Sequence, residues 1–301
     1  ARLMVGMQGL GIAESAYQVS LGFAKERLQS RSLSGPKAAD KPADPIIVHP
    51  DVRRMLLRQK VTIEGCRALA YFTGLHEDVA HDHEDPAVRE QADDLVQLLT
   101  PVVKAFLTDE GFNSANEGLQ VLGGSGFTED WGIEQLVRDS RITRIYEGTN
   151  GIQALDLVGR KLALGGGRAV RNYFALIEGW LKAHAEADHV MAVGGALKQL
   201  QQATMWIATE GMKDPEQAGA AATPYLRLFA LTSLAWMWAR MAAVAKAKLA
   251  EGSTETAFYG AKLKSADFFM ARILTETDSL LAEVKAGKAT LMAFSDEEFA
   301  A

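Results

Sequence analysis

Residues Arg141–Gln153 read RITRIYEGTNGIQ, and this stretch decides how the rest of the chain can be interpreted. Gly148 and Gly151 interrupt an otherwise helical pattern, so Glu147 is predicted to stand at a turn and not on a helix face. A carboxylate at a helix break, followed by glycine, is suited to accept a proton from a ligand that lies against bare backbone. The same triplet, Tyr-Glu-Gly, is also typical of surface turns whose glutamate meets only water.

Apolar residues recur at spacings of three and four along most of the chain, which predicts an all-α fold. Residues 30–50 contain too much proline for a helix and are predicted to form a loop. Pro101 either kinks one helix or restarts a second one. The predicted helices cover residues 1–28, 52–74, 88–122, 133 to the turn, 152–162, 170–181, 191–207, 225–244 and 258–281.

A run of three glycines at 165–167 divides the chain into two predicted domains, 1–164 and 165–301. The second part is rich in alanine and helical throughout, with a polar hinge at 211–224, and predicts an antiparallel helical bundle. We recognise no catalytic or ligand-binding motif in this second part. Its tryptophans and methionines, such as Trp236 and Met237, are interpreted as core or interface residues.

Composition limits the function. The formal charge of −6 argues against nucleic acid or an anionic membrane as a partner. The one cysteine, Cys66, excludes an internal disulfide and reads as a buried thiol in a reducing compartment, so we expect a cytoplasmic protein. No apolar run is expected to approach the ~20 residues that cross a bilayer. Because Ala1 opens in the middle of an amphipathic pattern, we expect a fragment of a longer protein.

Residues His76–Asp85 hold three histidines among five carboxylates, a composition that could ligate a metal, with His81 and His83 as ligands. The segment has no H-E-x-x-H spacing and no apolar support, and Pro86 follows it. We therefore predict a solvated loop between helices and no metal site.

Two further motifs precede the turn in a fixed order: Gln120–Phe127 reads QVLGGSGF, and Val137–Asp139 reads VRD. Together with the turn they resemble the C-terminal helical domain of the acyl-CoA dehydrogenases, over Arg2–Leu162. The resemblance implies a four-helix bundle followed by a second helical bundle. It also implies an acyl-CoA substrate, flavin adenine dinucleotide (FAD) as cofactor, and Glu147 as the base that removes the α-proton of the thioester.

The resemblance assigns roles to further residues. Contacts to FAD fall to Arg27, Gln120, Gly124 and Thr149, and those of Arg27, Gln120 and Gly124 reach a cofactor held by the partner subunit of a dimer. Support of the base or the substrate falls to Arg2, Tyr146 and Gly148. The chain departs from the family at Arg31, where the arginine motif has glycine, at Gln29, where it has threonine, and at Gly151, where many relatives carry glutamine. We expect the side chain of Glu147 to face a cleft shared with the glycine-rich segment.

Partners also follow from the resemblance: a homodimer, with electron-transfer flavoprotein as electron acceptor. The part after residue 164 resembles the extension of a subgroup that includes the methylmercaptopropionyl-CoA dehydrogenases, where it could replace a dimer–dimer contact. Three alternatives stay open: an acyl-CoA oxidase, a flavin-dependent hydroxylase that shares the fold but not the base, and a dimerisation or interaction module without catalysis. By itself the chain is expected to bind flavin poorly and to turn over no substrate.

Overall fold

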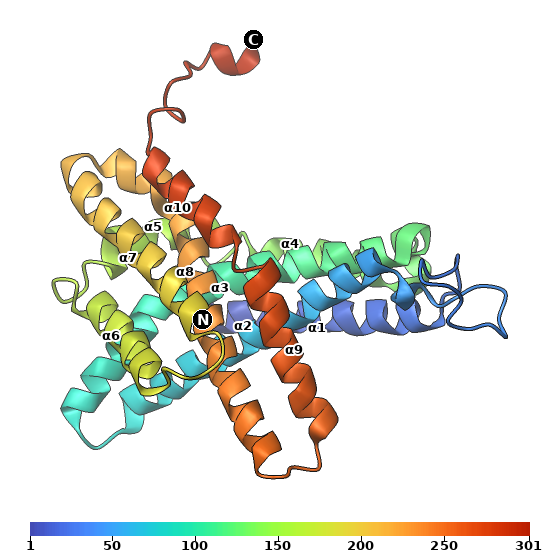
Figure 1. Cartoon of the computed structure of the whole chain (residues 1–301). Coiled ribbons are helices and arrows are strands. Elements are labelled where there is room, and N and C mark those ends of the chain that lie inside the picture. The colour runs from blue at the N-terminus through green and yellow to red at the C-terminus, as the bar shows by residue number, and fades with distance from the viewer.

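A computed structural model describes residues 1–301 and contains helices but no sheet, so the all-α prediction is confirmed (Figure 1). The one extended pairing is an isolated bridge between Leu28 and Pro45. Short helical turns are η1 (Ile46–Val48), η2 (Gly123–Phe127), η3 (Glu129–Trp131), η4 (Leu157–Lys161) and η5 (Glu298–Ala300). The longer helices are α1 (Arg2–Glu26), α2 (Pro50–Asp82), α3 (Pro86–Leu122), α4 (Ile133–Thr143), α5 (Asn150–Asp156), α6 (Arg168–Ala183), α7 (Val190–Lys213), α8 (Pro215–Ala250), α9 (Thr256–Arg272) and α10 (Glu276–Ala286).

Helices α1 and α4, with parts of α2 and α3, extend to one side as an arm (right in Figure 1). Within it, α1 crosses α3 with the two backbones in contact at Gly9 and Gly111. A Cβ atom on Gly9 would lie 2.6 Å from the carbonyl oxygen of Leu107, and one on Gly111 would lie 2.6 Å from that of Gly9. Glycine at both positions therefore sets the close distance between these helices.

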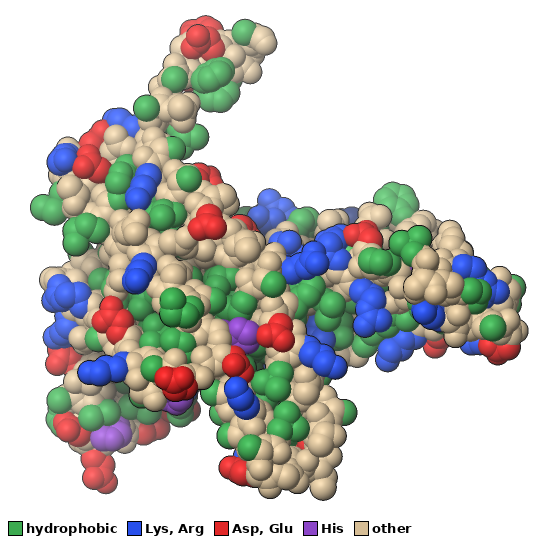
Figure 2. Space-filling model, viewed as in Figure 1, with side chains coloured by type: hydrophobic (Ala, Val, Ile, Leu, Met, Phe, Trp, Pro, Cys, Tyr) green, Lys and Arg blue, Asp and Glu red, His purple; other side chains and the backbone are tan.

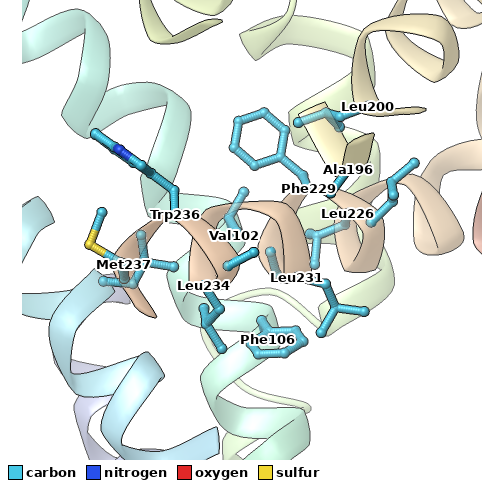
Figure 3. Close-up of a cluster of buried hydrophobic side chains, with 14 of the residues drawn as sticks. Val102, Phe106, Ala196, Leu200, Leu226, Phe229, Leu231, Leu234, Trp236 and Met237 are labelled. Carbon is cyan, nitrogen blue, oxygen red and sulfur yellow. The ribbon is translucent and has the colours of Figure 1, made fainter. Parts of the chain in front are cut away.

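The main core surrounds α8, whose side chains meet those of α3 and α7 (Figure 3). The buried cluster is continuous from the first helices to α10, so residues on both sides of the glycine run share it. Trp238 is fully buried, and its indole nitrogen donates a hydrogen bond to the carbonyl oxygen of Val61 on α2 at 3.1 Å. The predicted domain boundary at Leu164 is not marked by a break in the core, since the buried cluster crosses it. The boundary therefore stays a prediction.

Helix α8 corrects one expectation. It is long and apolar enough, by length and composition, to cross a membrane, whereas no such stretch was expected from the sequence. Of its most apolar window, 78% is buried inside the protein. A helix at the centre of a helical core has the same composition.

The histidine-rich segment is also different from the prediction, because α2 continues through Gly74 and ends only at Asp82. His76 lies within the helix. Its Nδ1 atom is 2.7 Å from the carbonyl oxygen of Phe72, and its ring lies against that of Phe72. The residues of this segment can all adopt helical conformations, so nothing ends the helix before His83.

The predicted helix over 88–122 is confirmed as α3: it is continuous through Pro101, so the alternative of a second helix restarted at that proline is wrong. Two other predicted boundaries change. The predicted hinge is mostly helical: only Asp214 separates α7 from α8, and its side chain caps α8 by accepting from the backbone N–H of Glu216 at 3.0 Å. The last predicted helix is broken between α9 and α10, where Ile273 and Leu274 are buried in the core. That burial turns the chain although no glycine or proline marks the site.

Candidate active site

Glu147 lies in the turn between α4 and α5, as predicted. Its φ angle is +56° and that of Gly148 is +85°, so two successive residues adopt left-handed backbone conformations. Such a conformation is uncommon for a glutamate and persists only where the surroundings impose it. The turn is therefore a rigid feature that the rest of the fold holds in place.

Two side chains from outside the turn bind its carbonyl groups. The ammonium of Lys104, on α3, donates to the carbonyl oxygen of Gly148 at 2.8 Å. The amide of Gln153, on α5, donates to the carbonyl oxygens of Glu147 at 3.2 Å and of Gly148 at 3.3 Å. These bonds fix the orientation of the peptide that follows Glu147.

Asn150, the first residue of α5, ties the turn to α3. Its side-chain oxygen accepts from Lys104 at 2.8 Å, and its side-chain nitrogen donates to Asp109 at 2.9 Å. Asp109 also pairs with Arg144, which is just before the turn, at 2.6 Å. Burial raises the pKa of Asp109, and the pairing with Arg144 opposes that rise.

Arg2 lies beside the turn and contacts it through Gln153. Its Nη1 atom donates to the side-chain oxygen of Gln153 at 2.9 Å and to Asp156 at 2.7 Å. Burial acts to raise the pKa of Asp156, but the hydrogen bonds from Arg2 and Arg160 outweigh it, and the net shift is downward. Arg2 thus positions Gln153, which binds the backbone carbonyl of Glu147. That Arg2 supports the base itself stays a prediction.

Tyr146 and Thr149 have local partners. The hydroxyl of Tyr146 donates to the side-chain oxygen of Gln8 on α1. The hydroxyl of Thr149 caps α5 by accepting from the backbone N–H of Ile152 at 3.3 Å. Both bonds attach the turn to neighbouring helices, and the contact of Thr149 with FAD stays a prediction.

The side chain of Glu147 is exposed. The backbone N–H of Glu147 has no hydrogen-bond acceptor within the chain, and neither has that of Gly148. The cleft expected between Glu147 and the glycine-rich segment does not exist within one chain. From Lys104, which binds the turn, eighteen residues of α3 lead to Leu122 before the glycines, a helical length of about 27 Å.

The remaining predicted residues gather at the far end of the arm. Gln120 and Gly124 are at the end of α3, and Arg27 follows the last residue of α1. About 28 Å of helix separates Arg27 from Gln8, which contacts the turn. The structure therefore brings the predicted residues together in two groups, the turn group and the tip group, and one chain does not join them.

The tip group is suited to a diphosphate. Arg27 and Gln120 are exposed, and neither side chain forms a hydrogen bond or ion pair within the chain. Gly124 is exposed as well, and a Cβ atom there would meet nothing within 4 Å, so a ligand can approach its backbone. A guanidinium, an amide and accessible backbone are groups that bind phosphate oxygens. These residues fit the pyrophosphate part of FAD.

Three other features of the chain lie outside the turn group and the tip group. Burial raises the pKa of the Cys66 thiol well above its ordinary value, as expected for a core residue and not for a nucleophile. No group of three His, Cys, Asp or Glu side chains is placed to hold a metal ion. An apolar cavity of about 480 Å³ lies between α2, α8 and α9, where Phe72, Met237 and Phe258 line it, and it does not include the turn.

Sequence reasoning missed Lys104, Gln153 and Asn150, the three side chains that fix the turn. Lys104 stands in the apolar run VVKAFL, where a lysine is usually read as solvent-facing. Asn150 and Gln153 lie inside the quoted stretch, but their side chains were given no role. The role of Lys104 is revealed only by the structure, in which α3 lies beside the turn.

Comparison with known proteins agrees with this architecture. Residues 1–162 match the family described as acyl-CoA dehydrogenase, C-terminal domain, and residues 173–295 match one described as acetyl-CoA dehydrogenase C-terminal like. Both descriptions are of C-terminal domains, and the all-α architecture of this chain agrees with them. The chain belongs to the acyl-CoA dehydrogenase family.

One similar protein is the 3-methylmercaptopropionyl-CoA dehydrogenase of Ruegeria pomeroyi, 41% identical over 92% of this chain and 47% of that protein. Among solved structures, Caenorhabditis elegans ACDH-11 in complex with C11-CoA has a TM-score of 0.73 at 17% identity, covering 96% of this chain and 46% of that one. A Bacillus anthracis acyl-CoA dehydrogenase complexed with FAD has a TM-score of 0.70 at 20% identity, covering 94% and 48%. The chain thus spans about half the length of the relatives it matches.

Proposed function

We propose that the protein to which this chain contributes oxidises an acyl-CoA thioester to the 2,3-enoyl-CoA, with Glu147 as the base. The observation that carries the proposal is the turn itself. It presents an exposed carboxylate on a backbone that Lys104 and Gln153 hold in a left-handed conformation. Membership of the acyl-CoA dehydrogenase family supports it.

The α-hydrogen of a thioester is barely acidic, so its removal requires a fixed base and a carbonyl group polarised by hydrogen bonds. The carboxylate of Glu147 takes the α-proton. The backbone N–H of Glu147, which has no acceptor within the chain, can donate to the thioester oxygen where negative charge develops. The β-hydrogen leaves with its electron pair, and the double bond forms between the α and β carbons.

The tip group, Arg27, Gln120 and Gly124, would hold the nucleotide end of FAD, and Thr149 would contact it beside the turn. When bound, the flavin supplies the acceptor for the two electrons of the oxidation. Because the two groups lie at opposite ends of the arm, we propose a homodimer in which each chain lends its tip group to the site of the other. Electron-transfer flavoprotein as acceptor and a cytoplasmic location belong to the same proposal, and by itself the chain is expected to be inactive.

The test is Glu147→Gln in the complete flavoprotein. We expect acyl-CoA added without oxygen to bleach the flavin absorbance of the wild type and not that of the variant, because the amide cannot take the α-proton. Glu283→Gln, an exposed site on α10, is the matched control and should bleach normally. Flavin reduction at the wild-type rate in Glu147→Gln would remove Glu147 from this role.

Dehydrogenase and oxidase chemistry share this half-reaction and differ in what reoxidises the flavin. Hydrogen peroxide formed in step with substrate consumption in air would identify an oxidase. Turnover that requires an added electron acceptor and yields no peroxide is the result we expect.

A further inference from the structure

Residues 288–301 form a tail that follows α10 and leads away from the other helices (Figure 1). Every residue from 289 to 301 is exposed. Four large apolar side chains are among them, and 57–76% of each is accessible to solvent: Leu291, Met292, Phe294 and Phe299. Apolar side chains gathered in an exposed segment mark a surface for contact with another molecule.

The end of the tail has a local structure of its own. The rings of Phe294 and Phe299 lie 5.6 Å apart. The backbone N–H of Ser295 donates to the carboxylate of Glu298 at 2.7 Å, a bond of the kind that caps the start of a helix, and η5 follows. Between the two phenylalanines the sequence is SDEE, and none of its three carboxylates belongs to an ion pair. The tail therefore presents two adjacent aromatic rings and three carboxylates.

The apolar cavity between α2, α8 and α9 is a second exposed apolar surface on the same chain (Figure 2 shows one face of the molecule). Its volume of about 480 Å³ lies in the range of ligand pockets, and none of the side chains that line it is acidic. Four large apolar side chains at the cavity are more than half exposed: Tyr71, Leu75, Val244 and Phe258. A cavity that is apolar and open to solvent can accept apolar side chains from outside the chain.

Positive charge borders the apolar cavity. The guanidinium of Arg240, on α8, lies 5.6 Å from the centre of the Phe72 ring and 5.0 Å from that of Trp236, and it has no carboxylate partner. Lys262, on α9, lines the cavity as well and pairs with Glu64 on α2 at 2.9 Å. Arg240 is therefore the cation that is left for a carboxylate from outside, and the three carboxylates of the tail are complementary to it.

The tail begins far from the apolar cavity of its own chain. The backbone N–H of Lys288 donates to the side chain of Gln217, near the start of α8, at 3.0 Å. From Gln217, twenty-four residues of α8 lead to Met241 in the cavity wall, a helical length of about 36 Å. The six residues from Lys288 to Phe294 span at most about 22 Å when fully extended. Phe294 therefore cannot enter the cavity of its own chain.

We propose that the apolar cavity of one copy of this chain holds the tail of a second copy, with Phe294 and Phe299 inserted among its apolar side chains and the tail carboxylates facing Arg240. One contact then removes both exposed apolar surfaces from water. When two copies exchange tails, the arrangement closes, so it forms a pair and does not grow into a filament. This contact uses neither the turn group nor the tip group, so it is independent of the proposed function.

Chemical cross-linking in the complete flavoprotein tests the contact. Val244→Cys places a thiol at the cavity and Met292→Cys places one in the tail, whereas the native Cys66 is buried and should not react. We expect the double variant, treated with a short bismaleimide, to give covalent dimers on a denaturing gel, because the two thiols meet only between copies. Leu33→Cys with Val244→Cys is the matched control: Leu33 is 90% exposed in the loop after α1, and this pair should stay monomeric.

The role of charge is tested on the same double variant. Arg240→Glu, or Asp296→Lys together with Glu297→Lys, should lower the yield of covalent dimers on the order of 10-fold, because like charges then meet. The three changes combined should restore the yield. The two tail changes lie at exposed positions, so they keep the test valid even where Arg240→Glu does not fold.

Three results would overturn the inference. Monomers in which the two introduced thiols are linked to each other would mean that the tail closes on its own chain. Thiols that stay unlinked, or dimers formed equally by the Leu33 control, would mean that the tail and the cavity do not meet between copies. Dimers in undiminished yield after the tail charge reversal would remove the tail carboxylates and Arg240 from the contact.

Discussion

Replacing Gly9 by alanine tests the close crossing of α1 on α3. The added methyl group would lie 2.6 Å from the carbonyl oxygen of Leu107 and 2.8 Å from the Cα atom of Thr108. Both are backbone atoms, so no side-chain rotation can relieve the contact, and α1 has to move away from α3. Inserting one methyl group into a packed contact costs about 3 kcal/mol at the upper end of the usual range.

Helix propensity acts the other way, because alanine is favoured over glycine in a helix by about 1 kcal/mol. The net loss for Gly9→Ala is therefore about 2 kcal/mol. Gly11→Ala is the matched control: it lies two residues further along α1, is exposed, and an added Cβ would meet nothing within 4 Å. It should gain up to about 1 kcal/mol, so the two variants should differ by about 3 kcal/mol.

Urea denaturation followed by circular dichroism measures this difference directly. The midpoint should fall for Gly9→Ala and rise for Gly11→Ala, with similar slopes. Equal midpoints for the two variants would refute the reasoning, because propensity alone would then explain both.

Two further predictions concern single contacts. Trp238→Phe should lower the free energy of unfolding by about 1 kcal/mol, because the indole loses its hydrogen bond to the carbonyl of Val61; an unchanged urea midpoint would count against it. Backbone hydrogen bonds, first that of Ser32, lower the pKa of Asp44 from 3.8 to about 2 despite its burial. The stabilisation of residues 28–45 by this carboxylate is then complete above about pH 4 and is lost as the pH falls toward 2. The protection factor of that loop, which is the intrinsic exchange rate divided by the observed rate at each pH, should fall over this range in the wild type and be low at all pH values in Asp44→Asn; a wild-type protection factor that does not change with pH would disprove it.

Most of the fold could be predicted from the sequence, because apolar spacings of three and four report the buried face of a helix wherever that face is continuous. The errors have physical causes. The polar residues after Gly74 hide the end of α2, since they are compatible with a helix but carry no apolar pattern. The break at Ile273–Leu274 is imposed by burial in the core and has no local signal.

The candidate site could be predicted only in part. The order of motifs located Glu147 at a turn, and the structure has it there with a positive φ angle. One of the side chains that bind that turn, Lys104, comes from α3, more than forty residues earlier, and sequence spacing cannot reveal which lysine reaches it. Likewise, the cleft expected between Glu147 and the glycine-rich segment is not formed within one chain, because α3 carries that segment to the other end of the arm.

The indole of Trp238, which donates to the carbonyl oxygen of Val61, limits the substitutions that this protein can accept during evolution. Beneath the indole lies Gly65, where a Cβ atom would be 2.9 Å from the indole nitrogen. A larger residue at 65 is therefore tolerated only together with a smaller one at 238, although 173 positions separate them. Homologous chains should vary at these two sites as a pair, and a hybrid that joins the early helices of one homologue to the late helices of another should fold only when both sites come from compatible parents.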